Sequence, residues 1–152
     1  MISGEARHTR VVMGRLERGE PVVEGLARLA RFERIDAGFV RAQGAIEAVE
    51  LLRYDPAARA YVPLAAIPAA EGPWELVSLE GSVSLLGGQP EVRVWAVIAG
   101  AAAGVPLVRA GRLGEARALY VEFAVDVCDE GDLERRHDAV TGLPLWRPPR
   151  RR

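Results

Sequence analysis

Apolar and polar residues alternate most regularly between residues 77 and 85. Val77, Leu79, Gly81, Val83 and Leu85 share one side of this segment, and Ser78, Glu80, Ser82 and Ser84 share the other. A period of two predicts a strand with one buried and one polar face. After a turn at residues 87–90, a second alternation places Val92, Val94, Ala96 and Ile98 opposite Arg93, Trp95 and Val97. The two segments together predict a β-hairpin.

Residues 21–34 repeat their apolar side chains at helical spacing. The apolar set is Val22, Val23, Leu26, Leu29 and Ala30. Pro21 suits the first position of a helix, and Glu24 complements the positive end of the helix dipole. Arg28, Arg31 and Arg34 lie on the other face, which we interpret as a solvated surface.

Further strands are expected on both sides of the helix and towards the end of the chain, over residues 9–16, 39–42, 45–54, 61–67 and 119–127. Gly44 interrupts one of these runs, which is typical of a β-bulge. Residues 68–73 and 100–104 are expected to be loops, and residues 105–113 show no clear pattern.

The order of these elements predicts an α+β fold, in which a mostly antiparallel β-sheet packs against one main helix. The chain of 152 residues has the length of a single domain, which we place at residues 1–145. Residues 146–152 form a Pro- and Arg-rich tail beyond the expected core.

Composition narrows the class of protein. Hydrophobic residues make up 49% of the chain and charged residues 27%, which is typical of a folded globular protein and not of a disordered one. The formal net charge of -1 argues against a generally basic nucleic-acid binder. The sequence has no lysine, so every cationic site is an arginine site. Cys128 is the only cysteine, which excludes an intrachain disulfide. We find no signal peptide and no membrane span, so a cytoplasmic protein is expected.

Several short strings occur in an order that points to one family. They are Leu16-Glu17-Arg18-Gly19-Glu20, Gln43-Gly44-Ala45, Tyr54-Asp55, Glu75-Leu76-Val77-Ser78-Leu79-Glu80-Gly81, Gly88-Gln89-Pro90, Arg135-Arg136-His137-Asp138 and Thr141-Gly142-Leu143. In this order they resemble the plant-and-prokaryote-conserved (PPC) domain, which follows AT-hook motifs in plants and usually stands alone in bacteria. The resemblance covers most of the chain from about Val11 to Leu145, and it implies an α+β fold and a homotrimer.

The chain departs from this family at the positions of a metal site. Many bacterial members carry a His-x-His pair after the Gly-x-Pro turn and a third histidine further on. Here the pair falls on Arg93 and Trp95, and the third histidine falls on Arg109. Neither a guanidinium nor an indole can replace the lone pair of a neutral imidazole, so no metal and no cofactor are expected. An acidic residue common on the last strand is replaced by Tyr120.

Arg93 and Trp95 lie two residues apart and therefore share one face of a strand. One interpretation is that they stack in a trimer contact, since arginine and aromatic residues are enriched in interface cores. The other is that they bind a small anion together with Arg109 at the subunit boundary. Glu80 and Asp126 are alternative partners for these cations.

The densest cluster of positive charge lies in the tail. It comprises Arg147, Arg150, Arg151 and Arg152. The Arg147-Pro148 step is similar to part of an AT-hook, which inserts arginine into narrow minor grooves, although the hook's glycine is missing. The tail is therefore a candidate DNA contact, and a solvated solubility tail is the alternative.

A second segment resembles the one through which plant PPC domains engage transcription factors. The matching residues are Gly72, Trp74, Glu75, Leu76 and Val77, while Pro73 replaces an arginine. The simpler interpretation is a strand entering the core.

No catalytic constellation emerges from the sequence. His137 and Asp138 are adjacent, but neighbouring residues of an extended chain point to opposite sides and no nucleophile is placed beside them. The sequence thus predicts a non-catalytic, homotrimeric binding protein, DNA-binding or regulatory by resemblance. The alternative is a small-anion-binding or degenerate enzyme-like protein with an Arg/Trp pocket at the subunit boundary.

Overall fold

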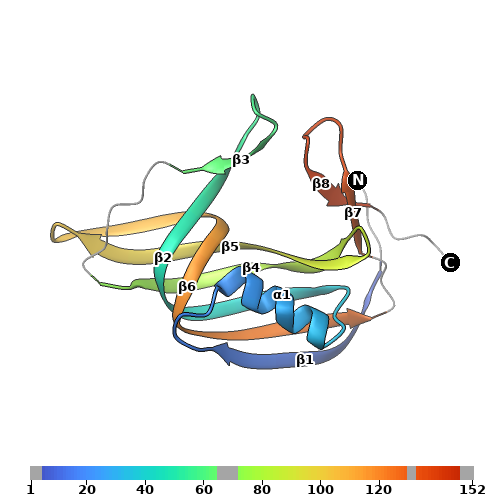
Figure 1. Cartoon of the computed structure of the whole chain (residues 1–152), viewed down its shortest axis with the longest axis horizontal. Helices are drawn as coiled ribbons and strands as arrows, with labels where there is room; N and C mark the ends of the chain where they lie inside the picture. The colour runs from blue at the N-terminus through green and yellow to red at the C-terminus, as the bar shows by residue number, and fades with distance from the viewer. Residues whose placement is uncertain (1–4, 65–71, 130–132, 148–152) are drawn as a thin grey trace.

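The computed structural model describes residues 5–64, 72–129 and 133–147. Its elements are β1 (Arg7–Leu16), α1 (Val22–Phe32), β2 (Gly38–Asp55), β3 (Ala60–Pro63), β4 (Trp74–Leu86), β5 (Gln89–Ala102), β6 (Val105–Asp129), β7 (Glu134–His137) and β8 (Pro144–Trp146). Strands dominate and the described residues contain one helix, which fits the α+β class (Figure 1).

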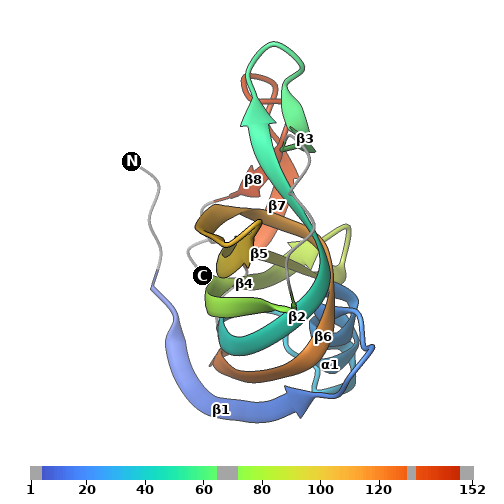
Figure 2. The same cartoon turned by 90° about the vertical axis from the view of Figure 1, so that its left-hand side faces the viewer.

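The described strands form one sheet in the order β3-β2-β6-β5-β4-β7-β8, with β1 paired to β6. In addition β2 pairs with β4, so that β2, β6, β5 and β4 form a closed circuit of antiparallel pairs. The one parallel pairing in the described sheet joins β7 to the end of β4. The β2–β3 arm and the β7–β8 hairpin both project from the sheet, away from α1 (Figure 2).

The buried side of α1 belongs to the same hydrophobic core as the inward faces of the strands. Val22, Leu26 and Ala30 are buried there, beside strand residues such as Leu79 and Ile98. The helix ends at Phe32, and Arg34, two residues beyond it, is left-handed with φ of 54°. The next N–H, from Ile35, donates to the Ala30 carbonyl at 2.8 Å, which satisfies a terminal carbonyl of the helix and sends the buried Ile35 side chain into the core.

The β-bulge expected at Gly44 is present, because the register of β2 against β4 shifts between Ala42 and Gly44. Gly44 has φ of 148°, and a Cβ at this position would overlap the Tyr120 carbonyl oxygen on β6. A glycine is therefore required where β2 passes between β4 and β6.

Three expectations differ from the structure or fall outside it. The loop expected over residues 100–104 is wrong, because β5 runs to Ala102 and the chain turns at Ala103 and Gly104. Residues 99–104 are all alanine or glycine, so the sequence shows no alternation of polar and apolar side chains there. Residues 105–113, which showed no pattern, form the first part of β6. Of the strand expected over 61–67 and the loop over 68–73, residues 65–71 lie outside the described part of the chain.

The end of the chain is more ordered than its composition indicated. Residues 134–137 and 144–146 form the β7–β8 hairpin, which the sequence did not predict. Trp146, assigned to the tail from sequence, is the last residue of β8, and its ring lies edge-on to Phe39 at 6.3 Å.

Candidate functional site

The face of the sheet that points away from α1 carries two rows of neighbouring side chains. Strand register gives one row as Met13, Ala124, Arg41, Glu80, Trp95 and Arg112, and the next as Val11, Asp126, Phe39, Ser82 and Arg93. We call this surface the outward face. Met13, Phe39 and Trp95 are 77%, 51% and 43% exposed, so the outward face displays large apolar side chains.

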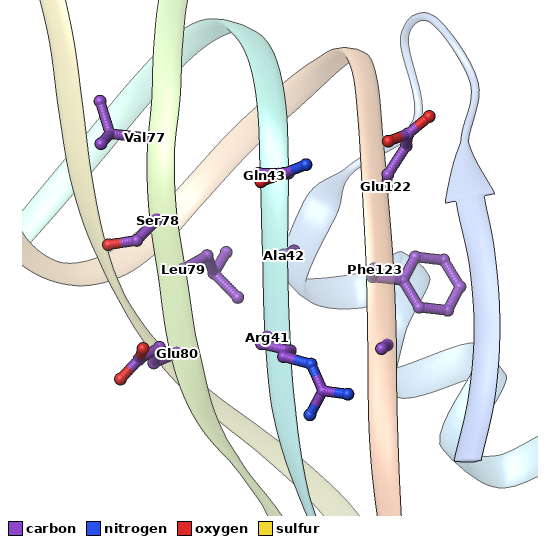
Figure 3. Close-up of a pocket in the computed structure, with 10 residues that line it drawn as sticks. Arg41, Ala42, Gln43, Val77, Ser78, Leu79, Glu80, Glu122 and Phe123 are labelled. Carbon is purple, nitrogen blue, oxygen red and sulfur yellow. The ribbon is translucent and has the colours of Figure 1, made fainter.

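A shallow groove of about 390 Å³ crosses the outward face between β2, β4 and β6 (Figure 3). Gln43, Glu80 and Glu122 line it together with Arg41, which forms an ion pair with Asp126. Carboxylates thus outnumber arginines along the groove. Such a lining disfavours phosphate groups, so the groove is not suited to a nucleic-acid backbone.

Arg93 lies at the edge of the outward face beneath the β7–β8 hairpin and is only 5% exposed. Its Nε and Nη2 donate to the two Glu91 carboxylate oxygens at 2.9 and 3.0 Å, and its Nη1 donates to the Pro144 carbonyl at 2.7 Å. This two-pronged geometry is the strong form of an arginine–carboxylate pair. Arg93 therefore ties β5 to the hairpin.

Arg135 on β7 is 7% exposed and lies close to the same carboxylate, with Nε 3.8 Å from Glu91. Its Nε donates to the Ser84 hydroxyl at 2.6 Å and its Nη2 to the Ser82 hydroxyl at 2.9 Å. The guanidinium carbon is 5.2 Å from the centroid of the Trp146 ring. Burial, and then the positive charge of Arg93, lower the pKa of Arg135 to about 10.

A third arginine, Arg112 on β6, approaches the same region. Its guanidinium carbon lies 4.5 Å from the centroid of the Tyr61 ring on β3. Burial lowers the pKa of Arg112, and the neighbouring Arg93 lowers it further. We refer to Arg93, Arg112 and Arg135, with Glu91, as the arginine cluster. It lies where β5 and β6 meet the β2–β3 arm and the β7–β8 hairpin.

The three anion-site residues expected from sequence are not brought together. Arg93 and Trp95 share the outward face, as their spacing implies. Arg109 pairs with Ile98, an odd number of residues from Trp95, and so points to the opposite face, where its Nη1 donates to the Val108 carbonyl at 3.0 Å. Arg112 is the residue of β6 that lies across from Trp95.

The tail and the partner segment are placed only in part. Arg147 is exposed beyond β8, and its backbone N–H donates to Glu134; Arg150, Arg151 and Arg152 lie outside the described residues. In the other segment Trp74 and Leu76 are buried in the core, while Gly72, Glu75 and Val77 are exposed. Two of the five candidate contacts for a partner are thus core residues.

The adjacent His137 and Asp138 do not form a catalytic arrangement with each other. His137 is exposed at the end of β7, and Asp138 accepts hydrogen bonds from the Thr141 backbone and hydroxyl at 2.8 and 2.7 Å. These bonds lower the pKa of Asp138. Within residues 5–64, 72–129 and 133–147, no three His, Cys, Asp or Glu side chains gather in a way that could hold a metal ion. Nor does any helix among these residues have the length and apolar character to cross a membrane.

Sequence reasoning missed Glu91, Arg112 and Arg135. One signal was present: Arg93 occupies a strand whose neighbours are almost all apolar, so a buried arginine needed a nearby carboxylate, and Glu91 shares its face two residues away. Arg135 is far away in the sequence, and only the parallel pairing of β4 with β7 brings it close.

Comparison with known proteins gives consistent results. A comparison with curated protein sequences finds no match. A metal-containing protein of Archaeoglobus fulgidus superposes with a TM-score of 0.85 at 26% identity, covering 97% of this chain and 99% of that one. A PPC protein of Pyrococcus horikoshii gives 0.83 at 23% identity, covering 97% of both chains. A candidate DNA-binding protein of Bacteroides thetaiotaomicron gives 0.78 at 18%, covering 93% of this chain and 96% of that one.

The family model for the Plants and Prokaryotes Conserved domain matches residues 3–128. This range contains the helix and all of the closed circuit of strands except Asp129, the last residue of β6, and the structure of the PPC protein of Pyrococcus horikoshii has the same fold. The protein therefore belongs to the Plants and Prokaryotes Conserved domain family.

Proposed function

We propose that this protein is a non-catalytic, homotrimeric binding protein that contacts DNA through its C-terminal arginines. The observation that carries the assembly is the outward face, where Met13, Phe39 and Trp95 are exposed in two adjacent rows. Soluble monomers rarely expose large contiguous apolar patches, and such patches mark interaction surfaces. Closed cyclic symmetry covers the patch on every subunit alike.

The DNA contact is assigned to the tail because the folded body offers a poor surface for phosphates. Carboxylates dominate the groove of the outward face, and the formal net charge of the chain is -1. Arg147, Arg150, Arg151 and Arg152 concentrate positive charge in one short segment. Structural relatives that are candidate DNA-binding proteins, in Bacteroides thetaiotaomicron and Ralstonia eutropha, support this choice of partner. Three tails on one trimer would bind with avidity.

A catalytic role is not part of the proposal. Asp138 is held in the turn by Thr141, and the adjacent His137 is exposed. Arg93, which the family resemblance places at a histidine position, donates from all its side-chain nitrogens to Glu91 and Pro144. We therefore assign these residues to stabilising the β7–β8 region and propose no acid–base role for them.

Light scattering tests the assembly. We expect a mass near three times the chain mass of 16.5 kDa at micromolar concentration. Trp95→Glu places a charge on the outward face and should lower this mass. Phe32→Glu is the matched control, since Phe32 is 83% exposed at the end of α1 and away from the outward face. A wild-type mass of one chain would overturn the trimer.

Retention of duplex DNA tests the tail. Binding by the wild type should show a log–log salt slope of about -0.9 for every phosphate that the tail neutralises. Replacing Arg147, Arg150, Arg151 and Arg152 by glutamine should abolish binding. Substitution is preferable to truncation after Leu145, which would also remove Trp146 from β8. Binding of DNA by the glutamine variant with unchanged affinity would place the contact on the folded body. The mass from light scattering should be unchanged.

A further inference from the structure

The arginine cluster has more positive than negative charge. Arg93 lies near Arg112 and Arg135 and, by repulsion of like charge, lowers the pKa of each. Glu91 is the carboxylate of the cluster and forms ion pairs with Arg93 and Arg135. Among the described residues this leaves an excess of two positive charges in a region where Arg93 and Arg135 are almost fully buried. Buried charge without a counterion is unfavourable, so this excess favours the binding of an anion.

The cluster also has hydrogen-bond donors to spare. All three nitrogen atoms of Arg93 donate to Glu91 or Pro144. Arg135 uses Nε and Nη2 on the two serines, and its Nη1 has no hydrogen bond among the described residues. None of the enclosed side-chain polar atoms in those residues lacks a partner, so this Nη1 is open to solvent.

Arg112 supplies the second set of donors. Its guanidinium stacks on the Tyr61 ring and makes no hydrogen bond within the part of the chain that the structure describes. Stacking occupies the flat face of a guanidinium and leaves its N–H groups, which lie in the plane, free to donate. Arg112 is also only half-buried, which gives a ligand a route to the cluster.

The donors are held in place by the surrounding elements. Tyr61 belongs to β3 and Trp146 to β8, and the Tyr54 hydroxyl donates to the Thr141 carbonyl at 2.9 Å between the two projections. Tyr54 and Tyr61 also meet edge-on, at 6.0 Å between ring centroids. A ligand would therefore meet arginines that are already oriented, which lowers the entropy cost of binding.

We propose that Arg112 and Arg135 bind the phosphate group of a small ligand, either the free ion or a terminal phosphomonoester. A phosphate dianion matches the two excess charges, and its oxygens suit the planar fork of a guanidinium. A phosphodiester in duplex DNA carries one charge per phosphate, and Arg135, 7% exposed, is recessed from a duplex surface. The site is independent of the tail and of the proposed DNA contact.

Titration calorimetry with inorganic phosphate tests this inference, at pH 8 and in a buffer free of phosphate and sulfate. We expect saturable binding to the wild type. Arg112→Gln should weaken it about tenfold or more, since hydrogen bonds to charged groups contribute about 1.5–3 kcal/mol. Arg109→Gln is the matched control, three residues away on the same strand and pointing to the opposite face, and should bind like the wild type.

A second measurement needs no variant. Phosphate should raise the melting temperature of the wild type as its concentration exceeds the dissociation constant, whereas an equal ionic strength of sodium chloride should not. Tighter binding of glycerol phosphate than of inorganic phosphate would identify an ester as the ligand, and the reverse order would identify the free ion. The proposal fails if neither compound binds saturably at millimolar concentration, or if Arg112→Gln binds phosphate as tightly as Arg109→Gln.

Discussion

The protein uses arginine in two opposite settings. On the helix side, Arg28 pairs with Glu20 at 3.0 Å and Arg31 pairs with Glu24 at 2.6 Å, and all four side chains are well exposed. In the arginine cluster, three arginines share Glu91. Water screens the exposed ion pairs of the helix, so each of them contributes little to the stability of the fold. Burial deprives the arginine cluster of that screening, so its one carboxylate matters far more.

Removing that carboxylate should give the largest effect. Glu91→Gln leaves Arg93 and Arg135 buried without a counterion, and we expect the free energy of unfolding to fall by about 2–3 kcal/mol. This is somewhat less than a fully buried pair would lose, because Glu91 is 28% exposed. Urea unfolding measures the change.

The helix provides the control for this comparison. Glu24→Gln removes the partner of Arg31 and should change the unfolding free energy by less than about 0.5 kcal/mol. If the two variants lose the same stability, burial does not distinguish the two settings and the contrast is wrong. Phosphate should recover part of the loss in Glu91→Gln, because the ligand would replace the missing negative charge.

A smaller effect is expected at the turn that joins β7 to β8. Asp138 is half-buried, and two hydrogen bonds from Thr141 lower its pKa below the ordinary 3.8. A lowered carboxyl pKa stabilises the fold above pH 3.8, and this contribution disappears as the pH falls through the folded value. Asp138→Asn should therefore be slightly less stable than the wild type at pH 6.

The difference should narrow as the medium is acidified below pH 3.8. Urea midpoints of Asp138→Asn and the wild type, compared at pH 6 and pH 3, measure this convergence. A difference that stays constant between the two pH values would show that the turn does not depend on the charge of Asp138.

The regions of the fold also differ in how far their structure could be predicted from the sequence. The β4–β5 hairpin was predictable because its inward side chains are apolar and its outward ones mostly polar. The expectation that Val77 shares the buried face is wrong, because the register shifts between Leu76 and Ser78 and leaves Val77 53% exposed. The bulge at Gly44 was predictable because a glycine inside a strand weakens it and often marks a bulge or a close approach of another backbone. The β7–β8 hairpin was not, since its strands are short and Arg135, the buried residue of β7, is charged.

For the candidate site, the sequence predicted which residues of one strand share a face, but not which residues of different strands are neighbours. The spacing of Arg93 and Trp95 placed them on one face, which the structure confirms. Within one chain Arg112, and not Arg109, lies across from Trp95, because the register of β6 against β5 cannot be read from one sequence. On its other side, β6 pairs with β2, and this pairing contains three register shifts. Each shift changes which residues point outward, so simple alternation along β6 does not predict its outward residues.

The closed circuit of strands has a consequence for how the chain is made. Gly38 at the start of β2 lies between Val83 of β4 and Val127 of β6. A ribosome releases these partners in order, and the last of them emerges long after α1. Until residue 127 has left the exit tunnel, α1 and β2 lack the part of the core that β6 contributes, including Val121, Val125 and Val127. The circuit can therefore close only after β6 has emerged, because β6 pairs with both β2 and β5.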